Sequence, residues 1–598
     1  MQMIRPIFLV FLILPVTAFS PASYDYVVVG GGTAGIVLAT RLAQREFTVA
    51  LVEAGGRYQS KSFAAIPATG PLRAGSQPHL KSLIDWGFVV QHQPGVNKRL
   101  IHYARGKCLG GSSAMNFMIY QRPTRDSMAK WAGAVNDSSY TWDQVLPYFQ
   151  RSVHFTPPNA SARFPNATAG FDPSVYDPHG GPLEVSYPNY AMAFSTWMKR
   201  GINAIGIDDI RDFNGGSVMG AQYSAATIRP RDQTRSSSQT SFLETNQPAS
   251  LTVYPYTLAK KITFDDQKRA TGVLVANHFG ELFRLYARRE VVVSAGAFQS
   301  PQLLMVSGVG PANILHDHGI EVIADRPGVG QNMWDHVFFG PSYRVRVLTF
   351  TNFTLRPWSM VQFFLEWAIR RRGMFTSNLS DYVAWEKIPS GLRSRFSNAT
   401  RADLARFPHD WPEAEYISAP GYIGAFLDPY FNQPKDGYQY AAILGVLVAP
   451  TSRGNVTLQS ADTAQLPIIN PNWLATKTDQ EVAIAMMKRV RQALHSTAMS
   501  PVIIGPECDP GDGVSTDAEI LEYIQNHVMP IWHASCTCKM GTHDDPMAVV
   551  DSQARVFGVH GLRVVDASAF PLLPPGHPQS TVYMLAEKIS DTMTGCRG

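Results

Sequence analysis

Cysteine and net charge are both scarce in this sequence. It has five cysteines among 598 residues and a formal net charge of +5 at pH 7. So few cysteines, and an odd number of them, allow at most one or two disulfides, and their spacing does not reveal the pairing. No Lys/Arg tract with interleaved aromatic residues occurs, so nucleic acid is not an expected partner. Cys536 and Cys538 lack zinc-ligand spacing and have no matching Cys/His pair nearby, so we expect no metal site.

Long apolar runs are missing after the N-terminus, so we do not expect an integral membrane protein. Residues 1–18 contain an early arginine, an apolar core and the small residues Val16 and Ala18, which is the pattern of a secretory signal peptide. Seven Asn-x-Ser/Thr sequons agree with export and would lie on the surface if glycosylated. They begin at Asn136, Asn159, Asn166, Asn352, Asn378, Asn398 and Asn455. We therefore expect a secreted, N-glycosylated protein.

The remaining composition is typical of a large globular chain. Hydrophobic residues make up 45% of it and charged residues 17%, with 47 glycines and 42 prolines. This balance indicates many loops and a core large enough for more than one domain.

A glycine-rich turn near the N-terminus predicts a nucleotide-binding site. The apolar run 24–29 is expected to form a strand, and Gly30, Gly32 and Gly35 follow it in the pattern G-x-G-x-x-G. The first glycine turns the chain, the second admits a pyrophosphate to the backbone, and the third lets the next helix pack on the strand.

The residues after these glycines complete the unit. A helix is expected from Thr33 to about Gln44 and a second buried strand over residues 48–52. The N-terminus of that helix would face the phosphates. Glu53 lies about twenty residues beyond the glycines, where a carboxylate would bind a ribose hydroxyl. This order of elements predicts dinucleotide binding: a strand, a glycine-rich turn, a helix, a second strand and an acidic residue.

Two further segments make the prediction more specific. Paired glycines and serines at 106–113 precede an apolar run, 114–120, that we expect to be helical. Residues 106–120 and 296–310 resemble the two signature sequences of the glucose-methanol-choline (GMC) flavin oxidoreductases, in the order typical of that family. Further matches continue to the C-terminus, so the chain is identified as a member of this family.

The resemblance implies the cofactor and its contacts. Members of the family bind FAD, most of them non-covalently, and we expect the same here. Some relatives attach flavin through a histidine near the position of Asn116, and asparagine cannot form that bond. The implied FAD contacts are Gly30, Gly32, Thr33, Ala34, Gly35, Glu53, Ala54, Trp86, Asn116, Phe117, Met118, Ile119, Ala259, Asp566, Ala567, Pro578 and Gln579.

The resemblance also implies an α/β fold with two domains. A Rossmann-like FAD-binding domain would comprise residues 19–188, 236–336 and 525–598. A substrate domain with an antiparallel sheet above the flavin would comprise residues 189–235 and 337–524. Runs at 438–448, 455–458 and 467–471 are expected to belong to that sheet. The loop-rich stretch 152–188 is either a cover over the flavin or a surface insertion.

Two C-terminal histidines are the candidate catalytic residues. Transfer of a hydride from a carbinol carbon requires removal of the hydroxyl proton, and a near-neutral imidazole suits that task. By position in the family, His533 corresponds to the base and His577 to a second residue that hydrogen-bonds the substrate oxygen. His102, His336 and His543 are expected to be structural or surface residues.

Cys536 departs from the family pattern, because relatives commonly have glycine three residues after the base. We expect an inert packing residue there, since a reactive thiolate requires an electropositive setting.

These features predict a secreted FAD-dependent oxidoreductase that oxidises a primary or secondary alcohol, with oxygen or another acceptor regenerating the flavin. Aromatic or polyketide-derived alcohols are the candidate substrates. Residues 574–581 resemble fungal members of the family from secondary metabolism, some of which are cyclases. A cyclase or dehydratase with structural FAD is therefore the alternative. Both histidines argue against a non-catalytic flavoprotein.

Expression in a eukaryotic host tests the leader and the sequons. The protein is expected in the medium, without about its first eighteen residues, and its apparent mass should fall on deglycosylation. Retention in the cytosol with Met1 intact would contradict this expectation.

Overall fold

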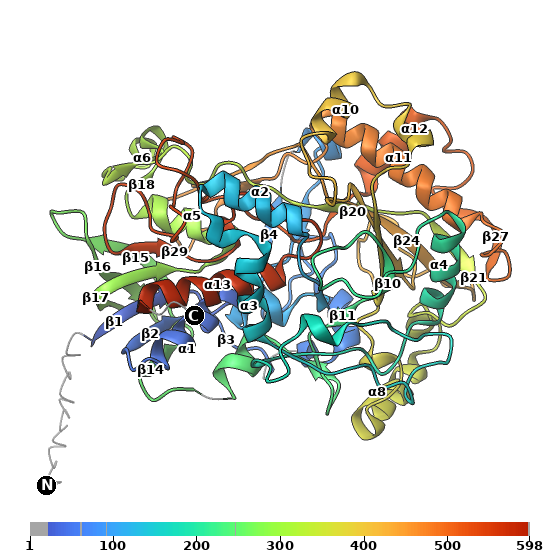
Figure 1. The fold of residues 1–598 in the computed structure, drawn as a ribbon, viewed down its shortest axis with the longest axis horizontal. Coiled ribbons are helices and arrows are strands. Elements are labelled where there is room, and N and C mark those ends of the chain that lie inside the picture. The colour runs from blue at the N-terminus through green and yellow to red at the C-terminus, as the bar shows by residue number, and fades with distance from the viewer. Residues whose placement is uncertain (1–21, 60–62, 91–92, 246, 596–598) are drawn as a thin grey trace, which may run out of the picture.

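The structure is a computed structural model that describes residues 22–59, 63–90, 93–245 and 247–595. The expected signal peptide, residues 1–18, lies outside the described residues, as does Cys596. Two sheets organise the described part of the chain (Figure 1). Among the described helices, none combines the length and apolarity needed to cross a bilayer.

The first sheet is mainly parallel. Its strands are β1 (Ala22–Val29), β2 (Val49–Val52), β14 (Leu251–Tyr254), β15 (Leu258–Phe264), β16 (Ala270–Ala276), β17 (Leu282–Val293) and β29 (Leu562–Val564). They follow the order β14-β2-β1-β17-β16-β15, with β29 beside β17. β1 pairs in parallel with both β2 and β17, while β16 and β15 continue the sheet antiparallel.

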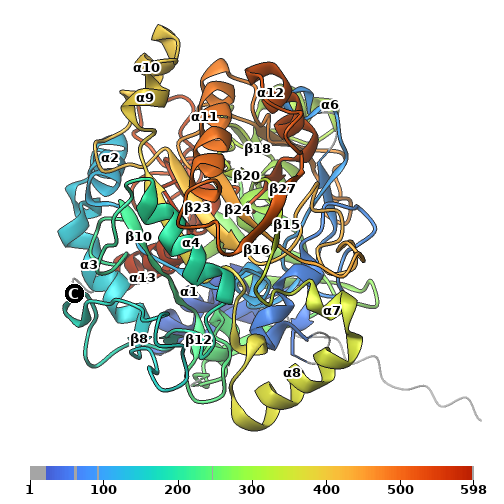
Figure 2. The same ribbon diagram turned by 90° about the vertical axis from the view of Figure 1, so that its right-hand side faces the viewer.

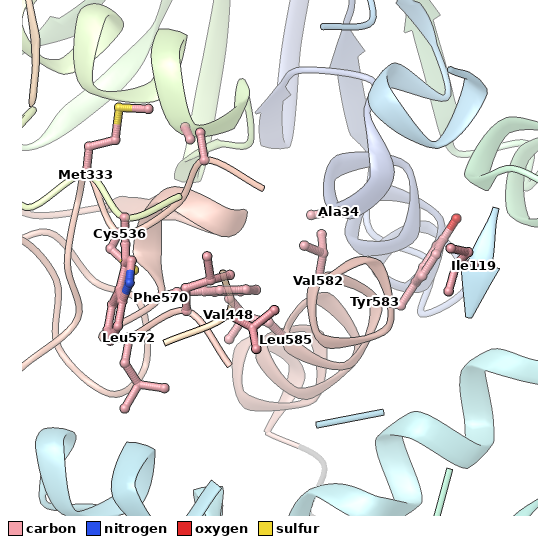
Figure 3. Packing of buried hydrophobic residues seen from close by; sticks show 14 of the residues in the cluster. Ala34, Ile119, Met333, Val448, Cys536, Phe570, Leu572, Val582, Tyr583 and Leu585 are labelled. Carbon is pink, nitrogen blue, oxygen red and sulfur yellow. The ribbon is translucent and has the colours of Figure 1, made fainter. Parts of the chain in front are cut away.

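Apolar strands at the centre of this sheet are buried on both faces, as a covered parallel sheet requires. Residues 26–29 of β1 and all of β2 are buried. The helices α1 (Thr33–Ala43) and α13 (Gln579–Thr594) pack against each other beside it. Val582 of α13 lies next to Ala34 of α1, and Tyr583 lies next to Ile119 (Figure 3). The C-terminal helix is thus brought to the N-terminal glycine turn.

The second sheet is antiparallel. Its strands are β10 (Gly220–Tyr223), β20 (Val337–Phe339), β21 (Ser342–Val345), β22 (Tyr382–Glu386), β23 (Ala414–Ala419), β24 (Gln439–Leu447), β27 (Ile503–Asp509) and β28 (Met529–Pro530). The helices α4 (Ala193–Ala204) and α11 (Lys477–Leu494) pack on it and lie in front of β23 and β24 in Figure 2. The predicted class, α/β with a second antiparallel sheet, is confirmed.

The expected elements around the glycine turn are present, and the helix ends at Ala43. The expected helix over 114–120 is wrong. A short 3-10 turn, Gly111–Ala114, is followed by the strand β7 (Ile119–Tyr120), which pairs with β11 (Ala225–Ala226). Met118 has a φ of +62°, and this left-handed conformation interrupts a right-handed helix.

The runs at 455–458 and 467–471 also differ from expectation. They form β25 (Asn455–Thr457) and β26 (Ile468–Asn470), which pair with each other outside the large antiparallel sheet.

The two sheets largely follow the predicted division of the chain. Every strand of the first sheet falls in the segments assigned to FAD binding. In the second sheet, β28 lies a few residues beyond the predicted boundary at 525. The domain boundaries themselves stay a prediction.

The seven sequons do not all lie on the surface. Asn136, Asn159, Asn166 and Asn398 are exposed and Asn455 is partly buried. In contrast, Asn352 is 7% exposed and Asn378 is 1% exposed. Asn378 Nδ2 donates to the Phe117 carbonyl at 2.9 Å, so this side chain belongs to the interior. The surface position that glycosylation requires is therefore absent at these two sites.

Replacing Gly35 by alanine tests the close packing at the start of α1. A Cβ at Gly35 would lie 1.9 Å from the Gly30 carbonyl oxygen, which is backbone that cannot rotate away. Gly35→Ala is expected to lower the free energy of unfolding by about 1–3 kcal/mol and to weaken FAD retention.

Gly133→Ala is the matched control, because Gly133 also lies in a helix but no atom is within 4 Å of its Cβ position. It is expected to be neutral or stabilising by up to about 1 kcal/mol. Thermal unfolding of the two variants checks the difference, and equal melting temperatures would contradict it.

Candidate active site

One large pocket is lined by residues from both sheets. The turn after β1 and the end of β2 contribute Gly30 and Glu53, while β20, β23 and β24 contribute Phe338, Ile417 and Leu444. All the predicted FAD contacts except Gly35 line this pocket, and so do both candidate histidines. Segments that are far apart in sequence are therefore brought to one site.

The glycines form a cradle that larger side chains would fill. Gly30 has a φ of +105°, and a Cβ there would lie 2.3 Å from the Ser294 carbonyl oxygen. A Cβ on Gly111 would lie 2.7 Å from the Cα of Gly32, so the two glycine-rich segments meet directly. Because the first hydrogen bond of α1 runs from Ile36 N–H to the Gly32 carbonyl, the preceding N–H groups are available to a phosphate.

The carboxylate of Glu53 is fixed at the end of β2. Its Oε2 accepts from Gly31 N–H at 2.9 Å and its Oε1 from Gly55 N–H at 2.8 Å. Burial raises the pKa of Glu53 to about 7, against the effect of these hydrogen bonds. Each carboxylate oxygen has a second lone pair, so a ribose hydroxyl can still donate to it. The cradle and this acid fit FAD.

Asn116 connects the segments beside the expected flavin. Its Nδ2 donates to Gln579 Oε1 at 3.0 Å, and its Oδ1 accepts from Arg235 Nη1 at 2.7 Å and from Met118 N–H at 3.1 Å. Gln579 in turn donates to the Ile119 carbonyl. These bonds position residues 116–119 against the start of α13.

His533 and His577 lie at right angles in the pocket wall, with ring centroids 5.0 Å apart. His533 Nδ1 is 3.1 Å from His336 Nδ1, which leaves Nε2 of His533 for a ligand. His577 Nε2 is 2.8 Å from Glu415 Oε1, which leaves Nδ1 of His577 for a ligand. Each histidine is thus oriented by a buried partner.

His336 was expected to be structural or on the surface, but the structure places it against the candidate base. Burial lowers the pKa of His336 to about 3, so it stays neutral and can accept a hydrogen bond from His533. Burial and the charges of His577, His336 and Arg105 hold the pKa of His533 well below its usual 6.5. His533 is therefore a neutral imidazole at physiological pH.

The two other histidines are where they were expected. His102 is buried and hydrogen-bonded to Asp85 and to the Gly75 carbonyl, and His543 is exposed.

Asp335 holds the loop that contains His533. Its Oδ1 accepts from the backbone N–H groups of His533 and His336, both at 2.9 Å. Its Oδ2 accepts from Tyr103 Oη at 2.8 Å and Trp473 Nε1 at 3.2 Å. Burial raises the pKa of Asp335 to about 7, while these donors favour the carboxylate.

Sequence reasoning missed Asp335, His336 and Glu415 as parts of the site. Asp335 and His336 stand in a family-like run and offered a signal. Glu415 offered another, because it is a single acid in the otherwise uncharged strand β23.

The wall beyond the histidines is aromatic. Phe117 and Trp532 stack with centroids 5.8 Å apart and planes 16° apart, and Phe338 and Phe426 contact the same indole. Residues 71–74 and 423–429 also contribute to the lining, whereas no residue of 152–188 does. The stretch 152–188 therefore does not line the pocket, and its buried residues, among them Leu183 and Val185, pack into the core.

Cys536 is a buried packing residue, as expected. It lies among hydrophobic side chains, with Met333 and Phe570 nearby (Figure 3). Burial raises the pKa of its thiol to about 12, so it is not a nucleophile at neutral pH. Its φ of +67° also explains why glycine suits this position.

Asp335→Asn tests the buried carboxylate. An amide offers one acceptor oxygen in place of two, so its NH₂ group would face donors that now bind Asp335. Unsatisfied buried groups cost about 1–3 kcal/mol each, so the variant is expected to melt at a lower temperature and to reduce flavin more slowly. Asp544→Asn, at an exposed aspartate, is the control. Equal melting temperatures for Asp335→Asn and Asp544→Asn would contradict the role of Asp335 in holding the loop of His533.

Comparisons with known proteins agree with this geometry. Residues 24–338 and 450–586 match the two sequence profiles described as GMC oxidoreductase. Patulin synthase from Penicillium expansum is 50% identical over 579 residues, which cover 96% of this chain and 92% of that protein. Versicolorin B synthase from Aspergillus parasiticus is 42% identical over 578 residues, with 96% and 88% covered. The solved structure of an FAD-dependent oxidoreductase from Chaetomium thermophilum matches with a TM-score of 0.83 and 26% identity, covering 96% of this chain and 99% of that chain.

The chain belongs to the GMC oxidoreductase family and is an FAD-dependent oxidoreductase of the class that acts on alcohols.

Proposed function

We propose that this enzyme oxidises the carbinol group of a small organic alcohol, with His533 as the general base. The observation that carries the proposal is the orientation of His533 in the pocket that also contains the dinucleotide cradle. Bound FAD supplies the hydride acceptor, and oxygen or another electron acceptor regenerates it.

The hydrogen bond between His533 and His336 selects the tautomer that a base requires. If His533 Nδ1 carries the proton and donates it to His336, then His533 Nε2 keeps its lone pair for the substrate hydroxyl. This direction requires a neutral His336 with its proton on Nε2, and burial, which lowers the pKa of His336 to about 3, keeps the ring neutral.

His577 holds the substrate oxygen in this proposal. Its Nε2–H is directed at the fully buried Glu415, and its Nδ1 remains to contact the oxygen beside His533. Glu415 fixes the orientation of the ring. The pair then orients the carbinol between the two imidazoles.

We propose a ring-containing alcohol of fungal secondary metabolism as the substrate. The stacked Phe117 and Trp532 offer a flat apolar wall that suits an aromatic ring. The similarity to patulin synthase and versicolorin B synthase supports the same metabolic setting.

The second candidate is a synthase that cyclises or dehydrates its substrate and keeps FAD as a structural group. The 42% identity to versicolorin B synthase favours it. Anaerobic addition of substrate separates the two, because only an oxidation bleaches the flavin.

We further propose that the enzyme is secreted and N-glycosylated. The leader pattern in residues 1–18 supports export, and the exposed sequons at Asn136, Asn159, Asn166 and Asn398 support glycosylation.

His533→Ala tests the proposed base. A general base contributes about 10²- to 10⁴-fold in rate, so anaerobic flavin reduction should slow by that factor while FAD content stays unchanged. His577→Asn keeps a hydrogen-bonding group and should slow the reaction less. Loss of FAD or of folding in His533→Ala would instead indicate a structural histidine.

The pH dependence gives an independent check. The neutral form of His533 is the active base, and its pKa lies well below 6.5, so flavin reduction should remain fast at pH 6 and fall only at lower pH. That acid limb should vanish in His533→Ala. An acid limb at or above pH 6.5, or one that persists in the variant, would place the base elsewhere.

A further inference from the structure

Arg73 is a buried cation in the pocket wall, and one edge of its guanidinium group has no hydrogen-bond acceptor among the described residues. It closes the 3-10 helix η2 (Pro67–Arg73) and is 3% exposed. Its Nη1 donates to Thr69 Oγ1 at 3.0 Å. Its Nε and Nη2 are buried and have no hydrogen-bond partner among the described residues.

This arrangement is unfavourable unless a ligand completes it. A buried guanidinium is usually paired with a carboxylate or with several acceptors. Here burial and the nearby charge of Arg235 lower the pKa of Arg73 to about 9, so it is still cationic at neutral pH. Nε and Nη2 form the edge of guanidinium that binds a carboxylate through two parallel hydrogen bonds.

A second buried donor belongs to another residue of the pocket lining. The Nε1 of Trp532 has no hydrogen-bond partner among the described residues, and Trp532 stacks on Phe117. The helix of Arg73 reaches the same ring, since a Cβ at Gly70 would lie 3.1 Å from Phe117 Cε1. Arg73 and Trp532 both line the pocket, and each has buried N–H groups without an acceptor among the described residues.

We propose that Arg73 and Trp532 form a subsite for an anionic oxygen group of the substrate, a carboxylate or an ionised enol or phenol. The inference rests on the proposed function, because it takes the ligand of this pocket to be an organic substrate. The fork of Arg73 binds the anion and the indole N–H of Trp532 supplies a further hydrogen bond. The anion then fixes which end of the substrate points away from the histidines.

A phosphate of FAD is the other source of anionic oxygen. The glycine cradle and the N-terminus of α1 already provide a phosphate site. The experiment therefore measures FAD content beside ligand binding.

Benzoate and benzamide are suitable probes, because they have nearly the same shape and differ in charge. Each is titrated into the purified holoenzyme, and binding is followed by the change in flavin absorbance. The wild type is expected to bind benzoate at least about tenfold more tightly than benzamide, as a charge-assisted bidentate pair predicts. Equal dissociation constants in the wild type would overturn the proposal.

Arg73→Met should abolish the preference for benzoate, leave the affinity for benzamide unchanged and keep the FAD content of the wild type. Arg73→Lys keeps the positive charge but lacks the two parallel N–H donors of the guanidinium, so it should retain part of the preference for benzoate. This variant replaces Arg73→Met in the test if the methionine variant does not fold. Arg231→Met removes one charge from an exposed side chain and should change neither constant.

Two results with the variants would overturn the proposal. A preference for benzoate that persists in Arg73→Met would show that the anion binds elsewhere, for example at the histidines. Loss of FAD from Arg73→Met with the preference intact would assign Arg73 to the cofactor. Because binding needs no turnover, the titration is informative even if no alcohol reduces the flavin.

Discussion

The buried carboxylate of Asp335 is the constraint on which the active site depends. It joins the backbone of His533 to that of His336, and it anchors both to Tyr103 and Trp473. Tyr103 Oη also accepts from Ala534 N–H at 3.0 Å, so the loop after the base is held at two points. His533 lies on a loop rather than in a strand or helix, so these hydrogen bonds determine its position.

Three histidines lie together in the wall of the pocket. Burial keeps His533 and His336 neutral, and the hydrogen bond between them orients both rings. Glu415 does the same for His577 from the opposite sheet. The antiparallel sheet therefore positions a side chain of the pocket wall, because Glu415 of β23 holds the ring of His577 from a fully buried position.

Local patterns were sufficient to predict the first two strands and the glycine cradle, since strand, turn, helix and acid lie within thirty-two residues, 22–53. Partners of the histidines were not predictable in this way. His336 and His533 are separated by 197 residues, and Glu415 and His577 by 162, so only the folded topology brings them together. The expected helix at 114–120 failed for a related reason. Its apolar residues pack locally, but pairing with β11 and the left-handed Met118 decide the backbone.

The position of Asn378 has a consequence for maturation. The side-chain nitrogen to which a glycan would be attached is the same atom that donates to the Phe117 carbonyl in the pocket wall. A chain modified at Asn378 cannot reach this structure, because the bulky sugar would have to occupy the interior. The structure is therefore incompatible with a glycan at Asn378, because the nitrogen that would carry the sugar anchors residue 378 to the pocket wall.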